Sequence, residues 1–217
     1  MPVETFGLYL VITNPATSYE ACAEAAVTAK LRYIQLRMKK TVRDRIVATA
    51  KNLRSITRGS ETRFIVNDDP SIATEAEADG VHLGQGDMAL PEARRLYPAL
   101  HIFGLSTHNE DQVRRAAGLR PDYCGVGPVF ATPTKEIPDP ALGPAQAGAI
   151  IRTAPFTTVA IGGIDETNLA DVLNAGALNF SVVRYVCLAS QPIDAIRRLQ
   201  DIWQTFQTPS PHRPTPA

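Results

Sequence analysis

The chain has 217 residues, of which 44% are hydrophobic and 20% are charged, as is usual for a globular protein. Its 22 basic and 22 acidic residues cancel, so no overall charge favours binding to nucleic acid or to a membrane surface. Recognition of an anion must therefore come from a local group of cations.

The three cysteines, Cys22, Cys124 and Cys187, contain no Cys-x-x-Cys pair. This spacing argues against a structural zinc site and a disulfide framework. Because Cys124 and Cys187 lie in apolar stretches, we expect them to be small residues of the core. The N-terminal segment shows no signal-peptide pattern, and no apolar run reaches membrane-spanning length. We therefore expect a protein of the cytoplasm with no membrane partner.

Apolar, strand-like runs alternate with amphipathic, helix-like runs along the chain. Strands are expected at Gly7–Thr13, Tyr33–Arg37, Arg63–Asn67, Gly80–Leu83, His101–Ser106, Tyr123–Val126, Thr157–Ile161 and Phe180–Val183. Helices are expected at Ser18–Lys30, Val42–Thr57, Pro70–Ala76, Leu90–Tyr97, Glu110–Gly118, Pro144–Thr153, Glu166–Asn174 and Pro192–Phe206. Strict alternation predicts a parallel sheet with right-handed crossovers.

Eight such units in about 205 residues fit an α/β fold of the compact (β/α)8, or TIM barrel, type. An open doubly wound sheet is the alternative, although the first strand–helix turn, Thr13-Asn-Pro-Ala, lacks the Gly-x-Gly-x-x-Gly fingerprint. We expect residues 1–207 to form one barrel domain. Residues 208–217 are rich in Pro, Ser and Thr, which predicts a disordered tail.

Three polar side chains, Gln35, Arg37 and Lys39, alternate with apolar residues in the second strand. A strand has a period of two, so the polar three share one side. Because helices cover the outside of a barrel, we expect them to face the axis near the mouth. Arg and Lys at this spacing suit a phosphate or diphosphate. A solvated edge face is the alternative.

Acidic residues follow the third and fourth strands. Asn67, Asp68 and Asp69 end the third strand, and Asp87 follows the fourth. Neighbouring strands lie about 4.8 Å apart, so carboxylates from adjacent strand ends can approach one hard cation. Magnesium takes one or two carboxylates plus phosphate oxygens of a substrate. We expect Asp68 and Asp87 to bind Mg²⁺, while one of Asp68 and Asp69 caps the third helix; capping alone is the alternative.

Hydroxyl groups and glycines mark the ends of the later strands. Ser106 could bond a ligand or cap the following helix. Inside the fourth strand, His82 is expected to be a satisfied interior histidine with no catalytic role. A long loop carries Thr132, Thr134 and Lys135, which can surround an anion, and could act as a lid. The seventh strand ends at Gly162 and Gly163, and the eighth ends at Val183 and Arg184. Barrels often hold a phosphate at the ends of these two strands.

Together these strings resemble the thiamine-phosphate synthase family, also called thiamine-phosphate pyrophosphorylase. The resemblance runs from Tyr9 to about Trp203. It is most specific in four strings: Gln35-Leu-Arg-Met-Lys39, Val66-Asn-Asp68, Gly80-Val-His-Leu-Gly-Gln-Gly-Asp87 and Gly127-Pro-Val-Phe-Ala-Thr-Pro-Thr-Lys135.

The resemblance implies a (β/α)8 barrel that joins 4-amino-2-methyl-5-hydroxymethylpyrimidine diphosphate to 4-methyl-5-(2-hydroxyethyl)thiazole phosphate. Thiamine phosphate and diphosphate are the products. Matched by position, Arg37, Lys39, Asn67 and Lys135 would hold the diphosphate, Asp68 and Asp87 would bind Mg²⁺, and Gln35 and Ser106 would contact the aminopyrimidine. Thr132, Thr134, Gly163 and the backbone near Val183 would receive the thiazole phosphate. Lys135, Arg37 and Ser106 are the expected catalytic residues.

The sequence departs from the family pattern after the eighth strand. Many members have Val-Ser or Ile-Ser there, whereas this chain has Val183-Arg184-Tyr185. The arginine could replace the hydroxyl as a phosphate ligand or point outward. Small-molecule substrates are the expected partners, and assembly into a homo-oligomer is left open. The rival functions are a thiazole tautomerase on the same barrel, a sugar-phosphate epimerase or isomerase, and a non-catalytic phosphate-ligand sensor.

Overall fold

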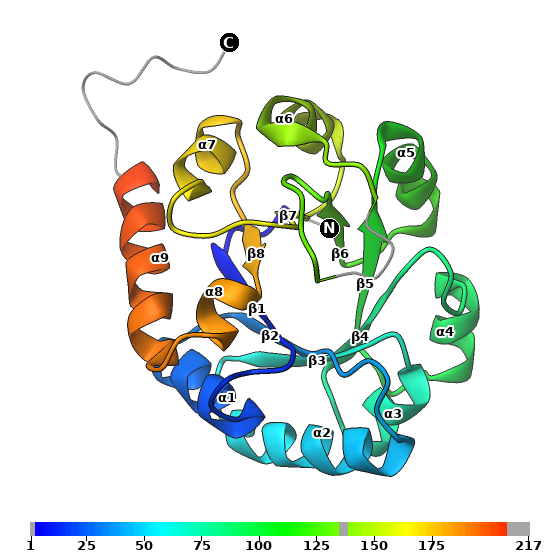
Figure 1. Ribbon diagram of the computed structural model, residues 1–217. Helices are drawn as coiled ribbons and strands as arrows, with labels where there is room; N and C mark the ends of the chain where they lie inside the picture. Colours follow the sequence, from blue (N-terminus) through cyan, green and yellow to red (C-terminus); the bar gives the residue numbers. More distant parts are fainter. Residues whose placement is uncertain (1–2, 135–138, 208–217) are drawn as a thin grey trace.

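Parallel strands form a closed barrel in the computed structural model, which describes residues 3–134 and 139–207 (Figure 1). The strands are β1 (Leu8–Ile12), β2 (Tyr33–Leu36), β3 (Arg63–Asn67), β4 (Gly80–Leu83), β5 (Ile102–Thr107), β6 (Tyr123–Val126), β7 (Thr158–Ala160) and β8 (Phe180–Val182). Each strand pairs with the next in chain order, and β8 pairs with β1. The predicted (β/α)8 barrel is confirmed, and the open doubly wound sheet is wrong.

Helices surround the barrel on the outside (Figure 1). They are α1 (Tyr19–Thr28), α2 (Arg43–Thr57), α3 (Pro70–Glu75), α4 (Leu90–Leu96), α5 (Glu110–Leu119), α6 (Gly143–Thr153), α7 (Leu169–Asn174), α8 (Arg184–Cys187) and α9 (Pro192–Gln207). The short α8, between the barrel and α9, was not predicted. Predicted Lys135 and the predicted tail at 208–217 lie outside the described residues.

The seventh helix begins at Leu169, later than the predicted Glu166. The cause is local, because the Asp165 carboxylate accepts hydrogen bonds from the backbone N–H and the hydroxyl of Thr167, at 2.9 and 2.6 Å. A carboxylate that bonds two residues onward closes a turn of its own. The helix therefore starts only after this turn ends.

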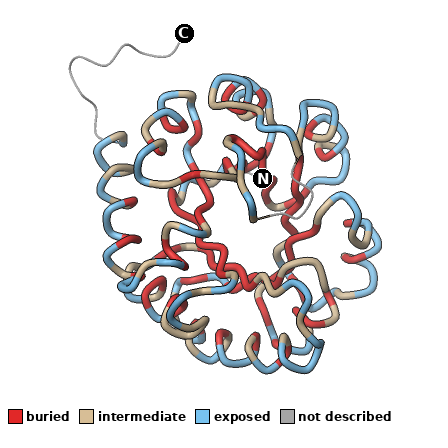
Figure 2. Tube along the Cα trace, in the orientation of Figure 1, coloured by how far each residue is buried: buried red, intermediate tan, exposed pale blue. Residues whose placement is uncertain are grey.

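Alternating side chains on the strands divide the core into two layers. On β1, Leu8, Leu10 and Ile12 face outward and pack under the helices, whereas Tyr9 and Val11 belong to a second cluster inside the barrel. Figure 2 shows the strands buried and the outer faces of the helices exposed. This is the arrangement that a strand period of two requires when both faces of a sheet are covered.

Aromatic rings fill the inner layer toward the start of the strands. The ring centroids of Tyr9 and Tyr33 are 5.5 Å apart, those of Tyr9 and Tyr123 are 5.5 Å apart, and Phe6 lies 4.7 Å from Tyr33. Offset and edge-on pairs at such separations are favourable. They close this part of the barrel interior, so the open space lies at the carboxyl ends of the strands.

The structure also tests two predictions made from the composition, one about the cysteines and one about membrane-spanning helices. Cys22, Cys124 and Cys187 are all buried with free thiols, which confirms that Cys124 and Cys187 are core residues. Among the helices within the described ranges, none is both long and apolar enough to cross a bilayer.

Asn179 joins the N-terminal segment to the base of the barrel. Its side-chain oxygen accepts from the backbone N–H groups of Phe6 and Gly7, and its amide donates to the carbonyls of Glu4 and Thr158. The residue is 1% exposed. We expect Asn179→Ala to lower the free energy of unfolding by about 3 kcal/mol, because it leaves buried backbone groups without partners. Urea denaturation measures the loss; the exposed Asn174→Ala is the control, and equal losses would contradict the prediction.

Candidate active site

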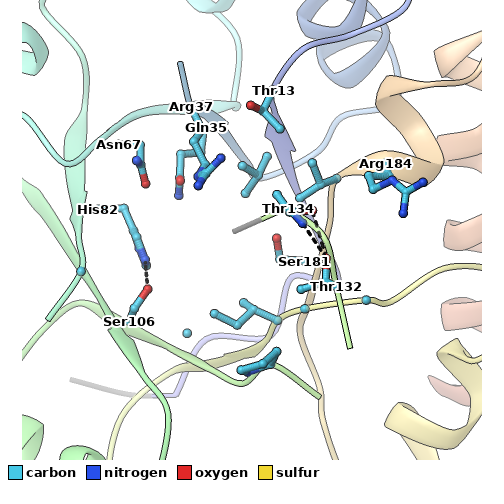
Figure 3. Close-up of a pocket in the computed structure, with 18 of the residues that line it drawn as sticks. Thr13, Gln35, Arg37, Asn67, His82, Ser106, Thr132, Thr134, Ser181 and Arg184 are labelled. Carbon is cyan, nitrogen blue, oxygen red and sulfur yellow. Dashed lines mark hydrogen bonds between the residues drawn. The ribbon is translucent and has the colours of Figure 1, made fainter. Parts of the chain in front are cut away.

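A cavity of about 1130 Å³ opens where the carboxyl ends of the strands meet. It is lined by every predicted site residue that lies in the described ranges: Gln35, Arg37, Lys39, Asn67, Asp68, Asp87, Ser106, Thr132, Thr134, Gly162, Gly163, Val183 and Arg184. Figure 3 shows several of these side chains converging on the cavity from different strands. The residues selected from the sequence therefore lie together around one cavity.

The second strand sends its polar side chains inward, as its period predicts. Ile34 and Leu36 are fully buried in the outer layer beneath the helices, and Gln35 is only 4% exposed on the opposite side. Arg37 and Lys39 continue toward the mouth and line the cavity. The alternative of a solvated edge face is wrong for this strand.

Asp68 and Asp69 have separate roles at the end of β3. Asp69 is the N-cap of α3, and its carboxylate accepts from the backbone N–H groups of Ser71 and Ile72, at 2.8 and 3.2 Å. Asp68 instead lines the cavity, and its carboxylate contacts the Lys39 ammonium. Asp68 also adopts a left-handed backbone with φ of 68°, a conformation that costs a non-glycine residue about 1 kcal/mol.

Asp87 completes an acidic pair with Asp68. Its Oδ2 accepts from the Gly84 backbone N–H at 2.6 Å. Burial raises the pKa of the Asp87 carboxyl, and its hydrogen bond with the Asp68 carboxyl raises that pKa further. The two carboxyl groups are thus close enough to share one proton or one cation.

Two adjacent carboxylates fit the coordination habit of magnesium. No cluster of three or more His, Cys, Asp or Glu residues with a metal-binding arrangement occurs within residues 3–134 and 139–207. A cation held by Asp68 and Asp87 would therefore take its other ligands from water or from phosphate oxygens, as Mg²⁺ does. The oxygen donors fit Mg²⁺, and its binding stays a prediction.

The raised pKa of Asp87 has a consequence for stability. A raised pKa in the folded state means that folding favours the protonated Asp87 carboxyl over the carboxylate. The stability that this carboxyl contributes to the folded state is therefore present at low pH and is lost as the pH rises through that pKa. We expect Asp87→Asn to raise the free energy of unfolding at neutral pH, by less than about 1 kcal/mol because the group is partly exposed.

The measurement is urea denaturation in EDTA at neutral pH and at about pH 4, close to the ordinary pKa of an aspartate. The gain should shrink at the lower pH. Asp201→Asn, on the exposed side of α9, is the control. A gain that is equal at both pH values would contradict the assignment.

Ser106 faces the cavity and does not cap the helix that follows it. The N-cap of α5 is Asn109, whose side chain accepts from the Gln112 backbone N–H at 2.9 Å. The Ser106 hydroxyl is 2.8 Å from Nε2 of His82 (Figure 3). His82 is 8% exposed, which confirms that it is an interior histidine with hydrogen-bond partners.

The glycines at the end of β7 permit a close approach between two loops. Gly162 and Gly163 have φ of 94° and 70°. A Cβ on Gly162 would lie 2.5 Å from Cβ of Pro128, and one on Gly163 would lie 2.7 Å from Cβ of Phe130. Only glycine tolerates both the left-handed backbone and this proximity. The loop after β7 is therefore held against the loop that carries Thr132 and Thr134.

Thr132, Thr134 and Arg184 lie on the same side of the cavity. Thr132 Oγ1 donates to Thr134 Oγ1 at 3.0 Å and accepts from the Thr134 backbone N–H at 3.3 Å. Arg184 is exposed at the start of α8 and still lines the cavity, on the side of Thr132 and Thr134 in Figure 3.

Several cavity residues were not predicted from the sequence. Tyr9, Thr13, Tyr123 and Ser181 also line the cavity, and Figure 3 shows Thr13 and Ser181 beside the predicted residues. A signal was available, because each lies next to an outward-facing apolar residue of its strand, such as Leu8 and Leu10 beside Tyr9 or Cys124 beside Tyr123. Applying the period of two to every strand would have selected them.

Comparisons with known proteins agree with this geometry. A family model described as thiamine monophosphate synthase matches residues 8–186. A thiamine-phosphate synthase of Methanospirillum hungatei JF-1 is 38% identical over 199 residues, which are 90% of this chain and 97% of that protein. A thiamine-phosphate synthase of Synechocystis sp. is 40% identical over 192 residues, which are 88% of this chain.

The chain covers 55% of the Synechocystis protein, so it spans about half the length of that relative. Among solved structures, a thiamine phosphate pyrophosphorylase from Pyrococcus furiosus superposes with a TM-score of 0.84 at 28% identity, covering 94% of this chain and 98% of that one. The chain therefore belongs to the thiamine monophosphate synthase family of enzymes.

Proposed function

We propose that this chain is a thiamine-phosphate synthase, a transferase that joins the pyrimidine diphosphate to the thiazole phosphate. The observation that carries the proposal is the division of one cavity into two polar sectors. The ends of β2, β3 and β4 supply cations and carboxylates, whereas the ends of β6, β7 and β8 supply hydroxyls, glycines and an arginine. Two anionic substrates could therefore meet across the mouth.

The β2–β4 sector suits the diphosphate. Arg37 and Lys39 are cations, and Asn67 offers an amide donor beside them. Lys135, which lies outside the described residues, is the remaining predicted ligand. Mg²⁺ on Asp68 and Asp87 would neutralise charge that develops on the departing diphosphate.

The reaction that we propose is dissociative. The bond between the pyrimidine methylene carbon and the diphosphate oxygen breaks, and its electron pair leaves with the diphosphate. The aminopyrimidine ring stabilises the carbocation, with Gln35 and Ser106 at the floor of the cavity as its contacts. The thiazole nitrogen then donates its lone pair to form the carbon–nitrogen bond. This sequence needs neither a general base nor a covalent nucleophile.

The β6–β8 sector suits the thiazole phosphate, through Thr132, Thr134, Gly163 and the start of α8.

We expect Arg184→Ala to raise the KM for the thiazole phosphate about tenfold with kcat nearly unchanged, which is the effect of losing one charge-assisted hydrogen bond. Arg184→Ser should stay within about threefold of the wild type, because a hydroxyl can also bond phosphate. Steady-state kinetics tests both, with the exposed Arg197→Ala as control. An unchanged KM in Arg184→Ala would mean that Arg184 points away from the substrate.

The direct test incubates the purified protein with both substrates and Mg²⁺ and measures thiamine phosphate by fluorescence after oxidation to thiochrome. We expect product that requires both substrates and disappears with EDTA. Folded protein that binds the thiazole phosphate without forming product would contradict the synthase assignment. That result would favour the tautomerase or the phosphate-ligand sensor.

A further inference from the structure

Five buried side chains form one continuous hydrogen-bond chain across the floor of the cavity. Gln35 Nε2 donates to Tyr9 Oη at 3.0 Å, and Tyr9 Oη lies 2.7 Å from Tyr123 Oη. Tyr123 Oη is 3.0 Å from Nδ1 of His82, whose Nε2 is 2.8 Å from Ser106 Oγ. We call this chain the floor relay. Its two ends, Gln35 and Ser106, are the residues proposed to contact the aminopyrimidine.

The barrel makes room for the floor relay at a single glycine. Gly104 of β5 is in register with His82 on one side and with Tyr123 on the other. A Cβ there would lie 2.2 Å from Cζ of Tyr123 and 2.6 Å from Nδ1 of His82. With glycine at this position, the two rings stack across β5, with centroids 5.5 Å apart and planes 24° apart.

The links of the floor relay have a defined direction. The direction follows from giving each buried hydroxyl an acceptor. Tyr9 accepts from Gln35, so Tyr123 is the relay neighbour that can take the Tyr9 O–H, and Tyr123 then donates to Nδ1 of His82. In a neutral His82 ring the proton then lies on Nε2 and is donated to Ser106. Gln35 is left with a carbonyl oxygen that can accept from a ligand, and Ser106 is left with an O–H that can donate.

The direction of the relay sets which amide atom of Gln35 faces a ligand. In the direction described above, Nε2 is held against Tyr9 and the amide oxygen can accept from a ligand; if every link reversed, the amide would turn, its oxygen would accept from Tyr9 and its NH₂ group would face the ligand. Burial raises the pKa of both Tyr9 and Tyr123, which keeps their hydroxyls protonated. Breaking an internal link would remove this constraint on the Gln35 amide and on the Ser106 hydroxyl.

We infer that Tyr9, Tyr123 and His82 are positioning residues that select a ring bearing a hydrogen-bond donor and an acceptor, because they hold the Gln35 amide oxygen and the Ser106 hydroxyl toward the ligand. The inference rests on the proposed synthase function, since an aminopyrimidine is such a ring: its amino group would donate to Gln35 and a ring nitrogen would accept from Ser106. A ring without the amino group leaves the Gln35 carbonyl without a partner, which binding should penalise.

The test is selectivity in binding, measured by calorimetry with Mg²⁺ and without the thiazole phosphate. Three probes are compared: the aminopyrimidine diphosphate, its des-amino analogue and inorganic diphosphate. We expect the wild type to favour the amino ring over the des-amino ring by about 100-fold, and Tyr123→Phe to reduce this ratio below about 10-fold. Affinity for inorganic diphosphate should be the same in both proteins.

Tyr33→Phe is the matched control. Tyr33 belongs to the same aromatic cluster, but its hydroxyl donates to Glu4 at 3.0 Å, away from the relay. It should keep the wild-type ratio. Tyr9→Phe cuts the relay at another link and replaces Tyr123→Phe if that variant does not fold by circular dichroism.

The outcomes separate the two proposals. A relay variant that binds both rings more weakly but keeps the wild-type ratio would make the relay merely structural and overturn the inference, while the synthase proposal stands. Wild-type protein that binds the aminopyrimidine diphosphate no more tightly than inorganic diphosphate would overturn the synthase proposal and the inference together. A lowered ratio in Tyr123→Phe with an unchanged ratio in Tyr33→Phe supports the inference.

Discussion

Asp68→Asn is expected to lower kcat/KM for thiamine phosphate formation by about 10³-fold, the largest effect of any single substitution considered. The side chain keeps its shape but loses the charge that would hold Mg²⁺ with Asp87. A metal that stabilises a departing diphosphate contributes several kcal/mol to the transition state, and each 1.36 kcal/mol is about tenfold in rate. The assay is thiochrome fluorescence over a range of Mg²⁺ concentrations.

The chain supplies a matched control at the next position. Asp69 is the N-cap of α3, and asparagine caps a helix about as well as aspartate. Asp69→Asn should therefore keep its stability and activity close to the wild type. If Asp68→Asn retained activity within tenfold and the wild-type dependence on Mg²⁺, the proposed metal site would be wrong.

The division of labour between these two aspartates illustrates what sequence reasoning could resolve. The string Asn67-Asp68-Asp69-Pro70 predicted that one aspartate caps the helix and the other faces the cavity, and the structure assigns the cap to Asp69. The barrel itself was also predictable. Strict alternation of strand and helix leaves few topologies open. The strands β3, β4 and β6 match their predicted limits because Asp68 follows the first and glycines follow the other two.

Contacts that depend on the register between strands could not be predicted from the sequence. His82 and Tyr123 are separated by 41 positions, and they meet only because each is paired with Gly104 on β5. A pattern within one strand gives the side that a residue faces, but not its height relative to the neighbouring strand. The four-residue α8 was missed for another reason, since so short a helix shows no full period of apolar residues.

Gly162→Ala is expected to lower kcat/KM with respect to the thiazole phosphate by about 10²-fold, mainly through KM. The added Cβ would lie 2.5 Å from Cβ and 2.6 Å from Cα of Pro128, so backbone must move. Two hydrogen bonds join these loops: Val129 N–H donates to Ile161, and Phe130 N–H donates to Gly162. If these loops move apart, Thr132 and Thr134 are displaced from Gly163, and a 1 Å misplacement of binding groups can lower the rate about 10²-fold.

Gly59→Ala separates this displacement from simple backbone strain. Gly59, next to the end of α2, has φ of 79°, close to the 94° of Gly162, but a Cβ there meets no atom within 4 Å. Both variants should lose about 1–2 kcal/mol of stability from the left-handed backbone, as measured by urea denaturation, and Gly162→Ala should lose more because Pro128 must shift. Only Gly162→Ala should lose affinity for the thiazole phosphate. Equal losses of activity would trace the effect to global stability, whereas a loss confined to Gly162→Ala would place the phosphate where the β6 and β7 loops meet.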